Sequence, residues 1–402
     1  RPGEGELVSL PHTWNALDGQ KGDGTYDRGS YWYVKMLDKW EPSVKYSRLF
    51  LEIPAAGQQA KVFVNGEFVV SHEGGYSAFR ADITEKCTEE FNTIAIWCSN
   101  EKCDAIYPQS ADFTFYGGLY RGAHLICVPE THFELLHYGD LGIHAATEPA
   151  SWDKEDFMLH IRTKICGVEK DNQVIYQIFD EDGKEVASAA RPADSPDTSI
   201  PLYKPHRWDI KNSYQYTLKA LIMRNNECLD EVELKFGVRT FCCDPGRGFL
   251  INGNCVPLRG VSRHQDKLYQ GNALTKEDHI RDAELIEEIG ANTVRLAHYQ
   301  HAQEFYNECD KRGFVVWAEI PFISVMNEDP LAHENCITQL KELIYQNDHH
   351  PSICFWGISN EILIGGISEK LVENHRELNA LAKKIDPYRL TTIAHVTMTP
   401  KD

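Results

Sequence analysis

An amide and a carboxylate stand side by side at the end of a long apolar run in this sequence. The run is SICFWGISNEI, residues 352–362, in which Asn360 and Glu361 follow residues that suit a strand buried on both faces. A carboxyl group can donate and accept a proton near neutral pH when apolar surroundings or a like-charged neighbour raise its pKa. We expect Phe355, Trp356 and Ile358 to supply the apolar surroundings and Glu319 the like charge, so Glu361 is the first candidate for a general acid or base.

Three other apolar segments in the same part of the chain also end in polar side chains. These side chains are Arg263, His264 and Asp266 after the first segment, Arg295, His298 and Tyr299 after the second, and Glu319 after the third. In a β/α barrel, functional groups gather where strands end and βα loops begin. We therefore expect these residues to share one active site with Asn360 and Glu361.

Strand-like and helix-like segments alternate after residue 242, which predicts a parallel sheet. The strand-like segments are CVPLRGV, ANTVRLAHY, FVVWAEI, SICFWGISNE and LTTIAHV. Thr275 and Asp278 form a capping-box pattern before one amphipathic segment, and Gly313 ends the next. A closed barrel needs about eight strands, so residues 242–402 are predicted to be the N-terminal part of an incomplete (β/α)8 TIM barrel.

The first 241 residues carry β signals throughout. Residues 1–129 alternate in polarity and contain Asn65-Gly66, a hairpin turn signal, which predicts a jelly-roll β-sandwich. Residues 130–241 predict a smaller Ig-like β-sandwich. The predicted fold class is therefore a multidomain β and α/β protein, with two sandwiches preceding the barrel.

Composition excludes some classes of partner. The net charge of −19 argues against binding to nucleic acid or to an anionic membrane. No run reaches the roughly 18 apolar residues that a membrane span needs. The 12 cysteines are scattered without zinc-site spacing, which predicts reduced thiols, no metal and a cytoplasmic protein.

Several longer motifs resemble glycoside hydrolase family 2, and within it the β-galactosidases. In the first 129 residues they are LPHTWNALDG, RGSYWYVKML and DFTFYGGLYRG. In the barrel they are LRGVSRHQD, GANTVRLAHYQHAQEFYNECDKRGFVVWAEIP and NDHHPSICFWGISNE. The resemblance covers nearly the whole chain, and it implies a sugar-binding jelly roll, an Ig-like domain and a catalytic barrel.

The resemblance implies retaining hydrolysis of β-linked sugars by two carboxylates. Glu361 corresponds to the general acid/base and Asn360 to the residue that contacts the sugar 2-hydroxyl. The other implied site residues are His264 and His298 lining the sugar, Asp112 reaching from the jelly roll, and Arg295 and Glu319 as supporting groups. In the family the nucleophile comes from the seventh barrel strand, so no residue here is assigned that role and the chain alone is expected to be inactive.

Two departures from the family pattern limit what carries over. Ile323 and Val325 stand where some members hold magnesium with a Glu and a His, and neither can ligate a hard cation. Gly122-Ala123 stands where the family usually carries Asp-Val, which puts a local jelly-roll contact in doubt. His72 and Asn100 are weaker candidates for the site.

The function expected from the sequence is an exo-glycosidase acting on terminal β-D-galactosides, which needs no redox cofactor. Its expected partner is a β-linked oligosaccharide or galactoside, and a homo-oligomer is compatible with the sequence. A β-glucuronidase of the same family is the nearest alternative. A non-catalytic carbohydrate-binding protein is the alternative from another class.

Overall fold

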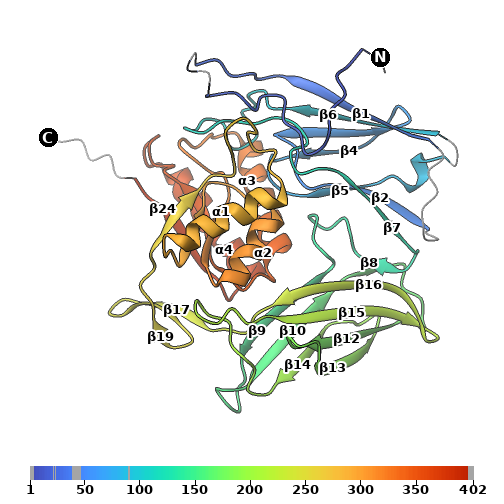
Figure 1. Cartoon of the computed structure of the whole chain (residues 1–402), viewed down its shortest axis with the longest axis vertical. Coiled ribbons are helices and arrows are strands. Elements are labelled where there is room, and N and C mark those ends of the chain that lie inside the picture. Colours follow the sequence, from blue (N-terminus) through green and yellow to red (C-terminus); the bar gives the residue numbers. More distant parts are fainter. Residues whose placement is uncertain (1–3, 21, 23, 39–46, 89–90, 397–402) are drawn as a thin grey trace.

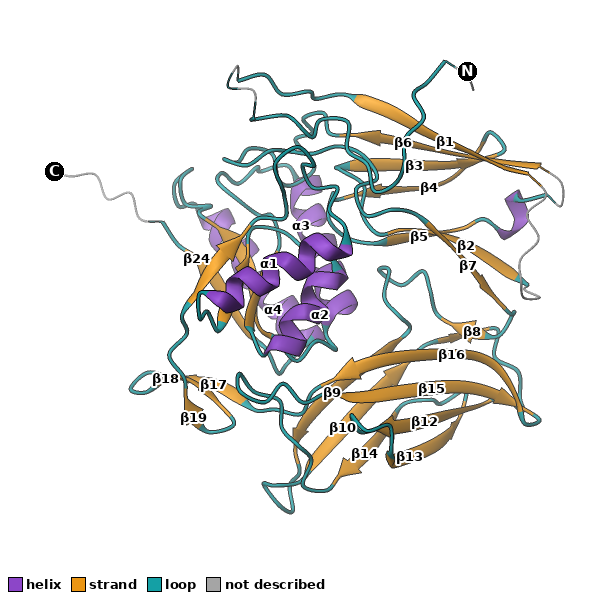
Figure 2. Cartoon of the chain, viewed as in Figure 1, coloured by secondary structure: helices purple, strands orange, loops and turns teal. Residues whose placement is uncertain are grey.

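The computed structural model describes residues 4–20, 22, 24–38, 47–88 and 91–396 of the 402-residue chain. Two β-sandwiches and one α/β unit follow one another along the chain (Figure 1). Helices α1 to α4 all belong to the α/β unit, and strands build the two sandwiches (Figure 2). The predicted fold class is confirmed, whereas the domain boundaries at 129/130 and 241/242 stay predictions.

The first sandwich consists of a four-stranded sheet, β1-β6-β3-β4, and a three-stranded sheet, β5-β2-β7. Its strands are β1 (Ser30–Asp38), β2 (Arg48–Ile53), β3 (Gln59–Val64), β4 (Glu67–Glu73), β5 (Phe79–Asp82), β6 (Phe91–Ser99) and β7 (His124–Val128). Alternating residues such as Val62 and Ile96 form one buried cluster with Ile53. Asn65 and Gly66 both have positive φ angles between β3 and β4, so the predicted hairpin turn is confirmed.

The second sandwich pairs the sheet β14-β10-β9 with the sheet β13-β12-β15-β16. Its strands are β9 (Ile143–Pro149), β10 (Phe157–Thr163), β12 (Gln173–Phe179), β13 (Glu185–Pro192), β14 (Thr198–Leu202), β15 (Tyr216–Arg224) and β16 (Glu227–Phe236). A short pair, β8 (His132–Phe133) with β11 (Ile165–Cys166), lies beside them. The three- and four-stranded sheets enclose one apolar cluster, as the Ig-like prediction requires.

A hairpin leads into the α/β unit. It consists of β17 (Phe241–Asp244), β18 (Gly248–Ile251) and β19 (Asn254–Cys255). The predicted strand CVPLRGV is wrong in extent, because Cys255 belongs to this hairpin and the first barrel strand begins only at Gly260. Pro257 lies between the two, and a proline cannot donate a ladder hydrogen bond.

The α/β unit is a parallel sheet in the order β20-β21-β22-β23-β24. Its elements in chain order are β20 (Gly260–Arg263), α1 (Lys276–Glu288), β21 (Thr293–Leu296), α2 (Gln303–Arg312), β22 (Val315–Glu319), α3 (Pro330–Asn347), β23 (Ile353–Asn360), α4 (Glu369–Ile385) and β24 (Leu390–Ala394). Thr275 and Asp278 complete the predicted capping box, and Gly313 ends α2 in the left-handed conformation. The described part of the chain therefore contains five strands of a TIM barrel.

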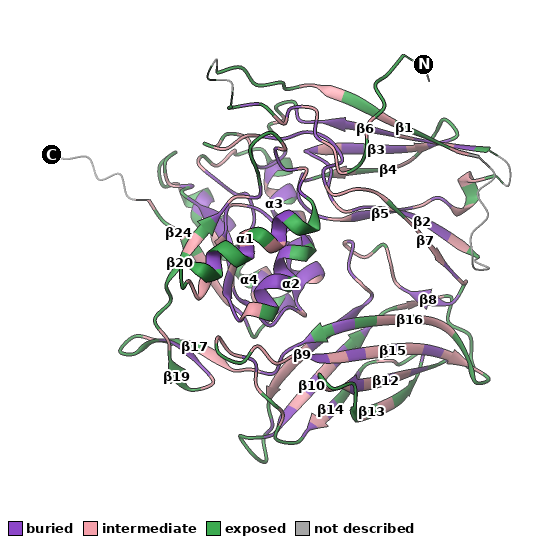
Figure 3. Cartoon of the chain, in the orientation of Figure 1, coloured by how far each residue is buried: buried purple, intermediate pink, exposed green. Residues whose placement is uncertain are grey.

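One face of this sheet packs against the helices and is buried there. Figure 3 shows buried residues in this unit as well as in both sandwiches. Leu296, Val316 and Trp356 from three strands share a buried cluster with Leu378 of α4. Side chains alternate between the two faces of a strand. The residues between these positions must therefore point to the other face, toward the inside of the barrel.

Candidate active site

Arg295 is the centre of a polar cluster on the inner face of the sheet. It lies in β21, and its guanidinium donates to both Glu319 oxygens, from Nε at 3.0 Å and from a terminal nitrogen at 2.9 Å. The same terminal nitrogen donates to Asn360 Oδ1 at 2.6 Å. The guanidinium also lies 4.6 Å from the Trp317 ring centroid. Three successive strands are thus joined by one fixed cation.

Glycine at position 357 makes room for this cluster. A Cβ atom there would lie 2.4 Å from Glu319 Cβ and 2.3 Å from Trp317 Nε1, closer than packed atoms can approach. Gly357 is opposite Glu319 in the pairing of β22 with β23. The Glu319 side chain is 0% exposed, so its charge depends on Arg295 for compensation.

His298 and His264 lie beside one another next to the cluster. His298 Nδ1 is 2.5 Å from Glu319 Oε1, which assigns the proton to Nδ1 and leaves Nε2 as a hydrogen-bond acceptor in the neutral ring. His264 Nδ1 lies within hydrogen-bond distance, 3.2 Å, of the Tyr299 hydroxyl oxygen. Burial, and then the neighbouring His298, lower the pKa of His264. The structure therefore brings both predicted histidines into the site.

A register shift at the end of β23 turns Asn360 inward. Pairing with β24 shifts between Gly357 and Asn360, and the Ser359 hydroxyl lies 2.7 Å from His375 Nε2 on α4. Asn360 is thereby directed to Arg295 on the other face. Glu361 follows in the left-handed conformation with φ of 48°, donates its backbone N–H to Ala394 and has an exposed side chain. Glu361 therefore directly follows a member of the cluster in the chain, with its side chain exposed.

The first sandwich supplies an aromatic side chain that the sequence analysis missed. The Phe113 ring lies 5.2 Å from the His264 ring and 6.1 Å from the His298 ring. Asp112 next to it is exposed, and its charge acts on His264 in the direction that raises the histidine pKa. Phe113 directly follows Asp112 in DFTFYGG. Its position next to a predicted site residue was the one feature of the sequence that could have indicated its place at the site.

Arg121 docks the first sandwich onto the barrel. It donates to the backbone carbonyls of Tyr76 and of Gln300, the latter at 2.7 Å. Tyr76 in turn stacks on Tyr299 with ring centroids 4.2 Å apart. Gly122-Ala123 departs from the family pattern, but the first sandwich still contacts the barrel, because the preceding residue, Arg121, makes this contact.

Two expectations about the surroundings of the site are wrong. Arg263 points to the helices, where its Nε donates to Asp282 of α1 at 2.9 Å. Trp356 donates to Asp386 at 2.9 Å, and Phe355 lies 5.6 Å from Phe249 of the hairpin. These two rings face the helices and the opposite end of the sheet, so they do not form the apolar wall expected around Glu361.

The weaker candidates from the sequence have structural contacts elsewhere. His72 Nε2 lies 2.8 Å from Glu342 of α3, and Asn100 donates to the carbonyl of Phe115 at 2.9 Å. Ile323 is 3% exposed and pairs through its backbone with Asn360. Its side chain contains only carbon and hydrogen and cannot ligate a cation. The absence of a magnesium site of the family kind therefore stays a prediction that rests on the chemistry of the side chain.

Comparisons with known proteins identify the family. A family model described as Glycosyl hydrolases family 2, TIM barrel domain, matches residues 245–401, and the model Glycosyl hydrolases family 2 matches residues 150–239. A β-glucuronidase of Bacteroides fragilis is 36% identical over 98% of this chain and 58% of that protein. A β-galactosidase of Thermoanaerobacter pseudethanolicus is 30% identical over 96% of this chain and 51% of that protein.

A solved structure is similar along the whole chain. The FMN-binding β-glucuronidase from Facaelibacterium prausnitzii L2-6 has 51% sequence identity and a TM-score of 0.95, over 100% of this chain and 62% of that chain. The present chain thus spans about half to three fifths of the length of these relatives. The two family models together account for most of the residues from the second sandwich to the barrel, and the chain belongs to glycoside hydrolase family 2.

Proposed function

We propose that the protein is a retaining β-glycosidase in which Glu361 is the general acid/base, and that its preferred substrates carry a terminal β-D-glucuronate. The observation that carries the choice of sugar is the 51% identity over the whole chain, at a TM-score of 0.95, to a solved β-glucuronidase. The curated β-glucuronidase relative is also more similar than the β-galactosidase, at 36% against 30% identity.

The hydrogen-bond pattern around Arg295 supports a sugar-binding role for its neighbours. Arg295 occupies the Asn360 oxygen, so the Asn360 amide group keeps its two N–H donors for a substrate oxygen. Glu319 accepts from His298 Nδ1, so His298 Nε2 can accept from a sugar hydroxyl. Asp112 would accept a further hydroxyl from the jelly-roll side.

Glu361 would donate its proton to the leaving glycosidic oxygen and later take a proton from the attacking water. A second carboxylate about 5 Å away is needed as the nucleophile in retaining hydrolysis. Glu319 does not suit this role, because Arg295 and His298 already occupy its oxygens. We assign the nucleophile to no residue of this chain.

Cleavage of β-galactosides is the second candidate, supported by the 30% identical β-galactosidase. The two activities are separated by measuring kcat/KM of the full-length protein on p-nitrophenyl β-D-glucuronide and β-D-galactoside side by side. We expect at least a tenfold higher value for the glucuronide. The reverse ratio would assign the galactoside, and inactivity on both would favour the non-catalytic carbohydrate-binding alternative.

The role of Glu361 is tested by Glu361→Gln. We expect kcat/KM, which reports the step in which the leaving group departs, to fall by about 10²–10⁴-fold on p-nitrophenyl glycoside. The loss should be smaller on a dinitrophenyl glycoside, whose leaving group needs little protonation. Glu373→Gln, an exposed carboxylate of α4, is the matched control and should keep full activity. Equal losses on both leaving groups would remove Glu361 from the acid role.

Three statements about the context of the protein stay predictions: cytoplasmic location, possible homo-oligomerisation and the absence of a redox cofactor. None of the described helices is long and apolar enough to cross a membrane. All 12 cysteines are free, which fits a reducing compartment. One relative is described as FMN-binding, and the acid/base chemistry proposed here needs no flavin.

A further inference from the structure

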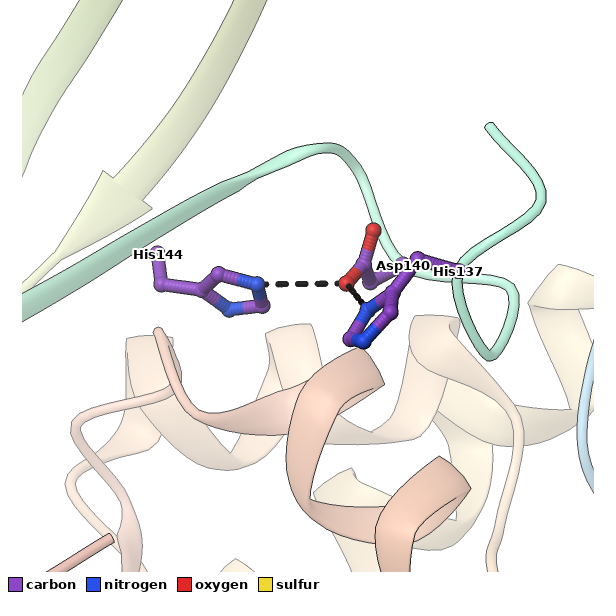
Figure 4. Close-up of side chains that lie close together, drawn as sticks. All are labelled: His137, Asp140 and His144. Atoms are coloured by element: carbon purple, nitrogen blue, oxygen red, sulfur yellow. Dashed lines mark hydrogen bonds and ion pairs between the residues drawn. The ribbon is translucent and has the colours of Figure 1, made fainter. Parts of the chain in front are cut away.

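Two histidines and one aspartate converge outside the active site, in the loop between β8 and β9 and at the start of β9. His137 Nδ1 lies 2.6 Å from Asp140 Oδ2, and His144 Nε2 lies 3.1 Å from the same oxygen. The carboxylate stands between the two rings (Figure 4). The three potential ligand atoms all lie within 4.8 Å of one another.

A second layer of contacts orients these side chains. His144 Nδ1 lies 2.9 Å from Asp348 Oδ2, so the carboxylate of Asp348 can hold the ring with Nε2 directed at Asp140. Asp140 Oδ1 accepts the backbone N–H of Gly142 at 2.8 Å, which leaves Oδ2 for the cluster. A carboxylate that accepts the far N–H of a ligating histidine is the usual partner of metal-bound imidazole.

We propose that His137 Nδ1, Asp140 Oδ2 and His144 Nε2 bind a zinc-class divalent ion, with Asp348 as the group that orients His144. Two imidazole nitrogens and one carboxylate oxygen suit Zn²⁺ and exclude the hard, all-oxygen preference of Ca²⁺ and Mg²⁺. Neighbouring ligand atoms of a tetrahedral zinc ion are roughly 3.3 Å apart at the usual bond lengths. Two of the three separations are 2.6 and 3.1 Å, and the third is within 4.8 Å, so the side chains need to move only slightly apart to hold an ion.

The accessibility of the three side chains fits a site that one ion can enter. The side chains of Asp140 and His144 are 0% and 5% exposed, whereas that of His137 is 22% exposed. Water can therefore reach the cluster from the His137 side and fill a fourth position. Two buried carboxylates, Asp140 and Asp348, supply the negative charge that a divalent ion would neutralise.

A closed ion-pair network is the competing interpretation of the same side chains. When no ion is bound, burial alone would lower the pKa of His144, but Asp348 and Asp140 outweigh it and raise the pKa to about 9. A protonated His144 could then donate to both carboxylates. The two interpretations differ in one measurable respect, because only a metal site shows saturable, one-to-one binding of zinc.

The proposed site would fasten the second sandwich to the barrel. Asp348 is the C-cap residue of α3 and precedes β23, whose far end carries Asn360. The eight residues of β23 separate the two ends by roughly 25 Å at the rise of a strand. We therefore expect zinc to act on thermal stability through the interface and to take no part in glycoside cleavage.

The test is calorimetric titration of the chelator-treated full chain with ZnCl₂, together with its melting temperature. We expect one Zn²⁺ per chain and a higher melting temperature with zinc. His137→Ala removes the most exposed ligand and should weaken zinc binding at least tenfold. Asp348→Asn, which removes only the orienting charge, should weaken it about 10–100-fold.

His160→Gln is the matched control. His160 lies on β10, and its Nε2 is 2.8 Å from a carboxylate oxygen of Glu148. Among the described residues, this pair is not part of a group of three potential metal ligands. The substitution of His160 should leave zinc affinity unchanged. Absence of one-to-one binding in the wild-type chain, or equal affinity of the wild type and His137→Ala, would overturn the proposal.

A cobalt spectrum provides a measurement that needs no variant. Co²⁺ bound by imidazole and carboxylate should show visible d–d absorption without a near-ultraviolet thiolate charge-transfer band. The distinction matters because the chain has exposed cysteines, among them Cys242 and Cys255. A thiolate band at one equivalent of Co²⁺ would assign the ion to cysteine and overturn the site.

Discussion

Two arginines on neighbouring barrel strands have similar partners and opposite surroundings. Arg263 ends β20 and lies close to Asp282, with ring nitrogens of His279 and His301 each 3.1 Å from its guanidinium. Arg295 in β21 binds Glu319 and lies 3.2 Å from His298 Nδ1. The first group is packed among helices, and the second opens toward the mouth of the barrel.

The register of the sheet explains the difference. Arg295 pairs with Ser262, whereas Arg263 pairs with Leu296, which belongs to the cluster under the helices. Paired residues share a face and successive residues alternate. An offset of one residue therefore sends one guanidinium to the helices and the other to the site. The comparison shows that an arginine with a carboxylate and histidines around it can stabilise the fold or line the candidate site, depending on which face of the sheet it occupies.

The largest expected effect is that of Arg295→Met in the full-length protein. The variant leaves the buried Glu319 charge without its partner and frees the Asn360 amide to rotate. We expect kcat/KM to fall by at least about 100-fold and the free energy of unfolding to fall by about 3 kcal/mol. Steady-state kinetics and urea unfolding measure the two quantities. Arg259→Met, an exposed arginine near the same sheet, is the control for both.

Arg263→Met should lower stability and leave chemistry intact. The Arg263 side chain is 6% exposed, but its partner Asp282 is 36% exposed and can return to water. We therefore expect a loss of roughly 2–3 kcal/mol in the free energy of unfolding, below the full cost of a broken buried pair. The kcat of the folded fraction should stay within twofold of the wild type. A hundredfold fall in kcat at unchanged stability would contradict the assignment of the two faces.

The pH dependence of the free energy of unfolding should report the titration of His279, which lies beside Arg263 on the side of the sheet that faces the helices. Burial, and then the Arg263 charge, lower the pKa of His279 to about 3, while the unfolded value is about 6.5. The unfolded chain therefore binds more protons between these values, and the free energy of unfolding should fall as the pH falls below 6.5. The contribution is about 1.4 kcal/mol per pH unit.

His279→Gln isolates this contribution, because the glutamine oxygen can still accept from Arg263 and does not titrate. The two chains should be most similar in stability near pH 7, and the variant should become progressively more stable relative to the wild type as the pH falls to 4. The change in that difference with pH gives the slope. Parallel curves for the two chains across that range would show that His279 does not titrate as expected. Above pH 6.5 no slope is expected from this group.

The smallest expected effect is that of Phe113→Leu at the mouth. The variant keeps an apolar side chain and loses the ring contacts with His264 and His298. Such contacts are worth about 0.5–1.5 kcal/mol, so we expect the free energy of unfolding to fall by about this amount. Because the ring helps to hold the two histidines in place, we expect KM to rise by at most about tenfold, with kcat unchanged. A rise that matched the Arg295→Met loss would mean that the ring contacts the reacting sugar directly.

Local signals predicted where one helix of the barrel begins and where the next one ends. The capping box at Thr275 and Asp278 and the glycine at 313 act within one turn of chain, so their effect does not depend on distant residues. The alternation of strands and helices likewise predicted a parallel sheet, because covered strands must be apolar on both faces. The roles of the site residues, by contrast, stay proposals that the geometry supports.

Features that depend on the pairing of strands could not be predicted from one segment at a time. Trp356 was expected beside Glu361, but it faces α4, where it donates to Asp386. The shift between Gly357 and Asn360 breaks the alternation that the apolar run implied. Phe113 reaches the site from a separate sandwich, and no spacing within the barrel sequence points to it.

The sequence by itself determined the residue types and their order: an amide and a carboxylate after one apolar run, basic side chains after two others, and caps that start and stop the helices. These properties act through neighbouring residues, so they survive without knowledge of the fold. Only the tertiary structure decided which side chains meet, since the face of each residue depends on the register of its partner strand. That register directs Arg295, Glu319 and Asn360 to one point and turns Arg263 away from it.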